Sequence, residues 1–153
     1  MLSGSGRKHP QKIKKGGFTK WYGYSLHRTQ HGEWDYDLTW KPFVAPYVNY
    51  GWIRAIHLGQ KAVRNGKRIA VPVLVLCSEK SVYPRKWSTR LYDGDAILNV
   101  RHIRKYANRL NASDKKVISL TGALHDVMLS QVAVRQNAYE ELGKWLKIQL
   151  FFK

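Results

Sequence analysis

Hydrophobic residues follow a regular pattern only in the second part of the chain. The stretch VPVLVLCS at 71–78 is a continuous apolar run rich in β-branched residues, which predicts a strand buried on both faces of a parallel sheet. KKVISL at 115–120 predicts a second short strand. Between them, AILNVRHIRKYANRLN at 96–111 predicts a helix, because its apolar positions recur at helical spacing. That face is formed by Ile97, Val100, Ile103, Ala107 and Leu110.

The last apolar segment, VAVRQNAYEELGKWLKIQLFF, predicts a closing helix. Its apolar stripe contains Val134, Ala138, Leu142 and Trp145. Residues 71–150 therefore follow the order β-loop-α-β-loop-α, which is typical of an α/β fold with parallel strands joined by a helical crossover. Two strands that look buried on both faces need neighbours, and the rest of the chain offers few. The pattern therefore indicates an incomplete α/β fold, with residues 71–153 as its core segment.

The region before residue 71 has a different character. Residues 1–17 are rich in Gly, Ser and Lys, which predicts a flexible basic lead-in. Residues 18–70 are dense in aromatic side chains, and no clean period of 2 or 3.6 runs through the first half of this segment. GWIRAIHLGQKAV at 51–63 is the exception, because its apolar positions recur at helical spacing and Asn65-Gly66 follows as a stop signal.

Charge adds one alternative reading. The 153 residues carry 27 Lys and Arg against 10 acidic side chains, a net charge of +17. Such an excess attracts nucleic acid or an anionic surface by electrostatics alone, so a small basic binding module is the alternative hypothesis. Neither zinc-ligand spacing nor an RNA-binding aromatic motif accompanies the charge, so we expect no specific nucleic-acid partner. The single Cys77 lies in an apolar run and is predicted to be a buried thiol, which favours a cytoplasmic protein without a transmembrane segment.

The candidate chemistry lies just after the two predicted strands. Asp93 and Asp95 follow the first strand, and His125 follows the second. In open α/β sheets the functional side chains occupy the loops beyond the carboxyl ends of the strands. An acid followed by a histidine is the last part of the order Ser, Asp, His of a hydrolase triad, in which the carboxylate orients the imidazole and the imidazole takes the serine proton.

Three segments resemble the closing part of a known family. VPVLVLCS, DGDAILNVRHIRKYANRL and VISLTGALHDVMLS are similar to segments of the α/β-hydrolase group that contains monoacylglycerol lipases, lysophospholipases and serine aminopeptidases. The resemblance implies that Asp95, which opens DAIL, is the triad acid and that His125 of GALHD is the base. Asp93 is the alternative acid, and Asp126 is expected to have a structural role.

The resemblance extends to residues 18–70, which look like the cap segment of such enzymes. It implies hydrolysis of small acyl esters without a cofactor. Trp34 and Trp52 are the candidate substrate-binding residues of this cap, although packing explains the aromatic side chains equally well.

The nucleophile of such an enzyme is not found. The elbow requires G-x-S-x-G, and the nearest string, Gly23-Tyr24-Ser25-Leu26-His27, ends in His. Ser3 and Ser5 belong to the lead-in. We therefore expect the chain to be inactive alone, as a truncated reading frame, a degenerate copy, or half of an assembly that a complementary N-terminal half or self-association completes.

The other histidines are assigned no catalytic role. His27 and His31 lie four residues apart and would suit a metal only if their stretch were helical, and no third ligand accompanies them, so we expect no metal site. His57 and His102 are predicted to be solvated on helices.

Overall fold

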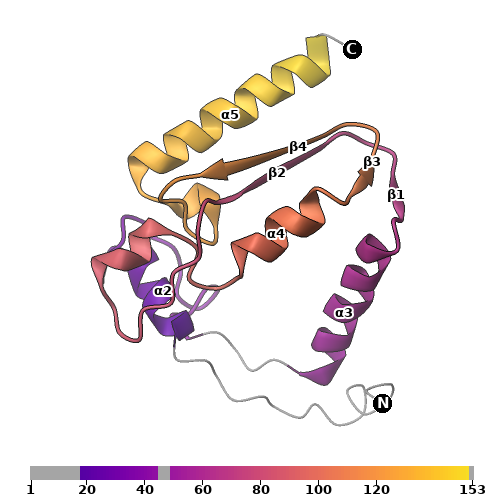
Figure 1. Cartoon of the computed structure of the whole chain (residues 1–153). Helices are drawn as coiled ribbons and strands as arrows, with labels where there is room; N and C mark the ends of the chain where they lie inside the picture. The colour runs from indigo at the N-terminus through magenta and orange to yellow at the C-terminus, as the bar shows by residue number, and fades with distance from the viewer. Residues whose placement is uncertain (1–17, 45–48, 152–153) are drawn as a thin grey trace.

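The computed structural model of the chain describes residues 18–44 and 49–151. The lead-in 1–17, with Ser3 and Ser5, lies outside the described residues. Helices and short parallel strands alternate along the chain (Figure 1). In order, the elements are α2 (Phe18–Leu26), α3 (Tyr50–Arg64), β1 (Arg68–Ile69), β2 (Val73–Ser78), the 3-10 helix η1 (Thr89–Asp93), α4 (Val100–Ala107), β3 (Asn111–Ala112), β4 (Lys115–Leu120), the 3-10 helix η2 (Val127–Leu129) and α5 (Val132–Phe151).

The two strands predicted from the apolar runs are present and pair in parallel. β2 and β4 lie in register over six residues, from Val73 opposite Lys115 to Ser78 opposite Leu120. The two-residue strands β1 and β3, which the apolar pattern did not reveal, also pair in parallel. Within the described part of the chain, each sheet has two strands, so β2 and β4 each keep one unpaired edge. The prediction of a mixed fold with parallel strands is thereby confirmed.

Burial of this sheet is uneven. Cys77 and Ser78 at the end of β2 and Leu120 at the end of β4 are buried, whereas the first four residues of β2 are only half-buried. The expectation that both strands are buried along both faces was therefore wrong, except for the last two residues of β2 and the last residue of β4. Figure 1 shows α5 along one side of the sheet and α4 on the other. The core accordingly gathers at the carboxyl ends of the strands, where two parallel strands and the loops after them meet.

The helices agree with the sequence pattern to different degrees. α3 matches the predicted helix, with the Asn49 side chain accepting the Trp52 N–H at 2.8 Å and Gly66 beyond its end at a φ of 72°. α5 also matches, and Ala138 on its predicted stripe is fully buried. α4 is shorter than the expected 96–111, because Asn99 caps it and the residues before Asn99 form a turn instead.

α2 is a helix that periodicity did not predict. Aromatic side chains surround this segment, so no apolar stripe stands out against a polar face. Tyr22 and Leu26 lie one turn apart on the helix and pack against Leu124, which follows β4. Long-range packing thus defines the inner face of α2, and this contact joins the 18–44 segment to the loop after β4.

Candidate active site

Asp95 and His125 form a hydrogen-bonded pair at the carboxyl end of the β2–β4 sheet. His125 Nδ1 lies 3.1 Å from Asp95 Oδ2. The second carboxylate oxygen, Oδ1, accepts the backbone N–H groups of Ile97 at 2.7 Å and Leu98 at 2.8 Å. The Asp95 side chain is 2% exposed and that of His125 is 29% exposed. Both oxygens of the Asp95 carboxylate are therefore hydrogen-bonded, whereas the imidazole of His125 is partly exposed to solvent.

Strand register explains why residues 30 positions apart meet. β2 and β4 end opposite one another, so the loops after them leave the same edge of the sheet. The Asp95 backbone then returns beside the end of β2, where its N–H donates to the Lys80 carbonyl at 3.0 Å. Gly94 permits this approach, since a Cβ at Gly94 would lie 2.3 Å from that carbonyl oxygen. The turn places the carboxylate under the His125 loop.

The two groups shift each other's pKa in opposite directions. Burial by itself would raise the pKa of Asp95, but the hydrogen bond from His125 and the two backbone N–H donors outweigh it and lower that pKa. The hydrogen bond to Asp95 raises the pKa of His125, against the opposing effect of burial. Both shifts favour an imidazolium beside a carboxylate.

These pKa shifts determine the pH range in which the pair stabilises the fold. A depressed carboxyl pKa contributes stability above the ordinary value of 3.8 and loses it as the pH falls through the folded pKa. A raised imidazole pKa contributes fully below the ordinary value of 6.5 and loses its contribution as the pH rises through the folded pKa. The contribution of the pair is therefore complete between pH 3.8 and pH 6.5.

Asp93, the alternative acid, lies elsewhere. It is the last residue of η1 and its side chain is exposed. The carboxylate that contacts His125 belongs to Asp95, so the structure separates two acids that the sequence left as alternatives.

Asp126 connects the His125 loop to the 18–44 segment. Its Oδ2 accepts hydrogen bonds from the Tyr22 hydroxyl at 2.9 Å and from Lys41 Nζ at 2.7 Å. Its backbone N–H donates to the same Tyr22 oxygen at 3.0 Å. Burial would raise the pKa of Asp126, but Lys41 and Tyr22 outweigh it and lower that pKa. We call Tyr22, Lys41 and Asp126 the latch. The contacts within the latch are of the structural kind that we expected for Asp126.

The latch also places the aromatic ring of Tyr22 against the Asp95–His125 pair, which we call the dyad. The ring centroids of Tyr22 and His125 lie 5.9 Å apart in an edge-to-face arrangement. Burial, followed by the charge of Asp126, raises the pKa of Tyr22 and keeps its hydroxyl protonated. Sequence reasoning missed Tyr22 and Lys41, because they are 104 and 85 residues away from Asp126 and belong to no recognisable motif.

A hollow of about 350 Å³ opens beside His125. Its wall is largely aromatic and comes from the 18–44 segment, with contributions from Tyr22, Tyr36, Trp40 and Phe43. Ile97, His125 and the Lys41–Asp126 ion pair also line it. Trp40 is 88% exposed at its rim. The arrangement places an apolar, half-open space next to the imidazole.

The two tryptophans proposed for substrate binding lie outside the lining of this hollow. Trp34 donates from Nε1 to the Leu129 carbonyl at 3.0 Å, and its ring lies 4.8 Å from the Arg135 guanidinium. Those contacts tie the 18–44 segment to η2 and α5. Trp52 is on α3 and is 56% exposed. Trp40 lines the hollow beside His125, and the sequence contains no signal that singles it out.

Ser25 does not sit in a nucleophile elbow. It lies within α2, is 3% exposed, and donates its hydroxyl to the Trp21 carbonyl at 3.1 Å. Ser130 is also buried, and its Oγ accepts the Leu124 N–H at 2.9 Å. Across residues 18–44 and 49–151, no serine hydroxyl is hydrogen-bonded to His125, and its Nε2 has no hydrogen-bond partner.

The remaining histidines have other surroundings. His27 is buried, with Nε2 3.0 Å from the Tyr36 carbonyl oxygen, whereas His31 is exposed and stacks on Trp87. No group of three metal-ligating side chains occurs among the residues that the structure describes. His57 on α3 and His102 on α4 are exposed, as predicted.

Comparisons with known proteins found no similar protein. No protein-family model matches the chain, and neither does any curated protein or solved structure. In the described part of the chain, none of the helices is both long enough and apolar enough to cross a lipid bilayer.

Proposed function

We propose that the chain supplies the acid and the base of a serine hydrolase of the α/β-hydrolase type, acting on small acyl esters. The observation that carries this proposal is the contact of 3.1 Å between Asp95 Oδ2 and His125 Nδ1 at the carboxyl ends of two parallel strands. The order of the two residues along the chain is that of the triad in this fold.

The geometry suits general acid–base catalysis. Asp95 accepts the Nδ1 proton of His125, which leaves a lone pair on Nε2, and Nε2 has no partner among the described residues. An imidazole in this tautomer can take the proton of a serine hydroxyl as the oxygen attacks the ester carbonyl. The resulting imidazolium can then protonate the leaving alcohol. Water repeats the sequence on the acyl-enzyme, and no step requires a metal or a cofactor.

The nucleophile in this proposal comes from a second polypeptide, a complementary N-terminal half. Two features support this. The unpartnered Nε2 borders the apolar hollow, and β2 and β4 each have an unpaired edge within the described residues. A strand that joins the open edge of either would extend the sheet. The aromatic hollow would then accept the acyl group of the ester.

The isolated chain tests both parts of the proposal. A fluorophosphonate probe should label no serine, whereas stoichiometric labelling would contradict the absence of an activated nucleophile. With p-nitrophenyl octanoate, an imidazole with a free Nε2 should accelerate hydrolysis slightly on its own. His125→Ala should abolish that rate, and the control His57→Ala, at an exposed histidine on α3 that lines neither the hollow beside His125 nor the one between α3 and α4, should not change it. A rate that survives His125→Ala would refute the assignment of the base.

One observation favours the alternative of a basic binding module. α3 and α4 carry six Lys or Arg side chains between them and no acidic residue. Binding of duplex or single-stranded nucleic acid, measured across a salt series, distinguishes the two functions. Sequence-dependent binding at physiological salt would favour the module, while a steep salt dependence without sequence preference would reflect only the charge of the chain.

A further inference from the structure

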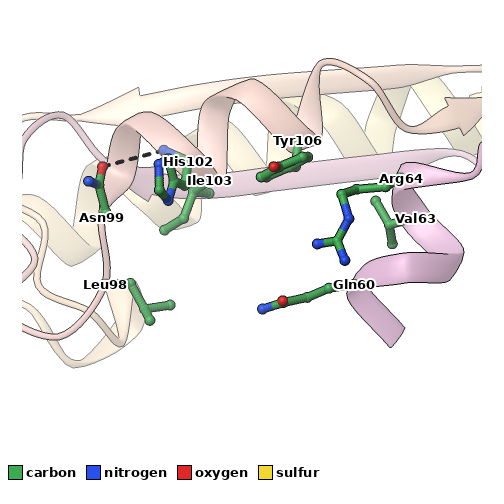
Figure 2. A pocket seen from close by; sticks show the side chains of 8 residues that line it. All are labelled: Gln60, Val63, Arg64, Leu98, Asn99, His102, Ile103 and Tyr106. Carbon is green, nitrogen blue, oxygen red and sulfur yellow. Dashed lines mark hydrogen bonds between the residues drawn. The ribbon is translucent and has the colours of Figure 1, made fainter. Parts of the chain in front are cut away.

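A second hollow lies between α3 and α4, apart from the dyad. Its volume is about 490 Å³, and it shares no lining residue with the hollow beside His125 (Figure 2). One wall consists of Gln60, Val63 and Arg64 in the last part of α3. The other wall is formed by α4 and the residues just before it.

Two ends of this hollow differ in chemistry. Figure 2 shows Arg64 and Gln60 together on the α3 side, with Tyr106 of α4 across from them. Leu98 and Ile103 lie at the opposite end, where α4 begins, together with Asn99 and His102, and Val63 lies beside Arg64. Among the described lining residues, Arg64 is the one side chain with a permanent charge, and Leu98 and Ile103 lie away from it, so the hollow combines an anion-binding group with apolar surface, as a pocket for an amphipathic molecule requires.

The polar groups at the first end have no hydrogen-bonding partner among the described residues. In the part of the chain that the structure describes, the Arg64 guanidinium, the Gln60 amide and the Tyr106 hydroxyl make no hydrogen bond or ion pair. No acidic side chain is among the described residues that line the hollow. A cation without a counter-ion, next to two neutral hydrogen-bonding groups, is complementary to an anion.

The guanidinium and the apolar lining together suggest a class of ligand. A guanidinium presents parallel N–H donors that match the two oxygens of a carboxylate. The apolar lining by Val63, Leu98 and Ile103 in turn matches a hydrocarbon body. We propose that the α3–α4 hollow binds a small carboxylate that carries an apolar chain, with the carboxylate at Arg64 and the chain toward Ile103.

Binding of three probes to the full chain tests this inference. Octanoate has both the head and the chain, acetate has the head alone, and octanol has the chain alone. Titrations followed by NMR should show octanoate shifting the methyl signals of Val63 and Ile103 and binding at least about tenfold more tightly than either other probe. Equal binding of octanol and octanoate would overturn the proposal, and so would the absence of shifts at these methyl groups.

Two glutamine variants on the same helix separate specific recognition from the general charge of the chain. Arg64→Gln should weaken octanoate about tenfold and leave octanol unchanged. Lys61→Gln removes the same charge from an exposed position that does not line the hollow, and it should have little effect. Equal losses in the two variants would refute a site at Arg64. Because His125 does not line this hollow, His125→Ala should leave octanoate binding unchanged, so the result is independent of the proposed hydrolase function.

Discussion

Replacing Tyr22 by Phe removes the one oxygen through which Tyr22 holds the loop of the candidate base. That oxygen donates to the Asp126 carboxylate at 2.9 Å and accepts the Asp126 backbone N–H at 3.0 Å, in a side chain that is 7% exposed. A hydrogen bond to a charged group contributes about 1.5–3 kcal/mol, and a neutral one about 1 kcal/mol. Allowing for Lys41, which still holds the carboxylate, we expect Tyr22→Phe to cost about 2–4 kcal/mol.

Tyr36→Phe is the matched control. The Tyr36 hydroxyl is also buried, and it has no hydrogen-bond partner among the described residues. An unpaired buried hydroxyl is unfavourable, so its removal should leave the free energy of unfolding unchanged or raise it by up to about 1 kcal/mol. The two variants make the same chemical change in the same segment and differ in the hydrogen bonds that they remove.

Urea denaturation, followed by circular dichroism and tryptophan fluorescence, measures both effects. For a urea m-value of about 2 kcal/mol/M, the midpoint should fall by about 1–2 M for Tyr22→Phe and should not fall for Tyr36→Phe. Coincident curves from the two probes would justify a two-state treatment. Equal destabilisation by the two variants, or a larger loss for Tyr36→Phe, would refute the assignment of the latch.

Two further predictions concern the Asp95 turn. Asp95→Asn should lower the pKa of His125, because the carboxylate that favours the imidazolium is removed. An NMR pH titration measures this shift. The control Asp93→Asn should have little effect on the pKa of His125, and an equal shift in both variants would exclude a specific pair. Gly94→Ala should cost at least about 1–3 kcal/mol, since its Cβ would lie 2.3 Å from a backbone oxygen. Gly59→Ala, within α3 and with nothing within 4 Å of the added methyl group, should instead stabilise the fold by about 0.5–1 kcal/mol in the same denaturation assay. A Gly94→Ala variant as stable as the original chain would contradict the close approach of Gly94 to the Lys80 carbonyl.

Local patterns were a reliable guide to the regular elements. The apolar runs predicted β2 and β4, and helical spacing predicted α3 and α5. Each of these signals depends on neighbours only a few residues apart, since a strand repeats every two residues and a helix every 3.6. The same rules failed for α2, whose buried face is defined by contacts with Leu124 rather than by contrast with a polar face.

The candidate site could be predicted from the sequence only in part. The positions of Asp95 and His125 after two parallel strands predicted that they would meet, because the carboxyl ends of such strands share one edge. The choice of Asp95 over Asp93 rested on the resemblance, and the geometry distinguishes them through the turn at Gly94 and the backbone donors of Ile97 and Leu98. That same turn shortened α4.

The sequence by itself therefore determined the long strands β2 and β4 and their parallel pairing, the helices α3 and α5, the net charge of +17 and the two loops that carry the dyad. The tertiary structure alone decided that Tyr22 and Lys41 hold Asp126, that Trp40 rather than Trp34 lines the hollow beside His125, and that Arg64 faces a second hollow with no acidic side chain among its described lining residues. The physical reason is sequence separation. Contacts between residues about a hundred positions apart follow from how whole elements pack, and no local period records them.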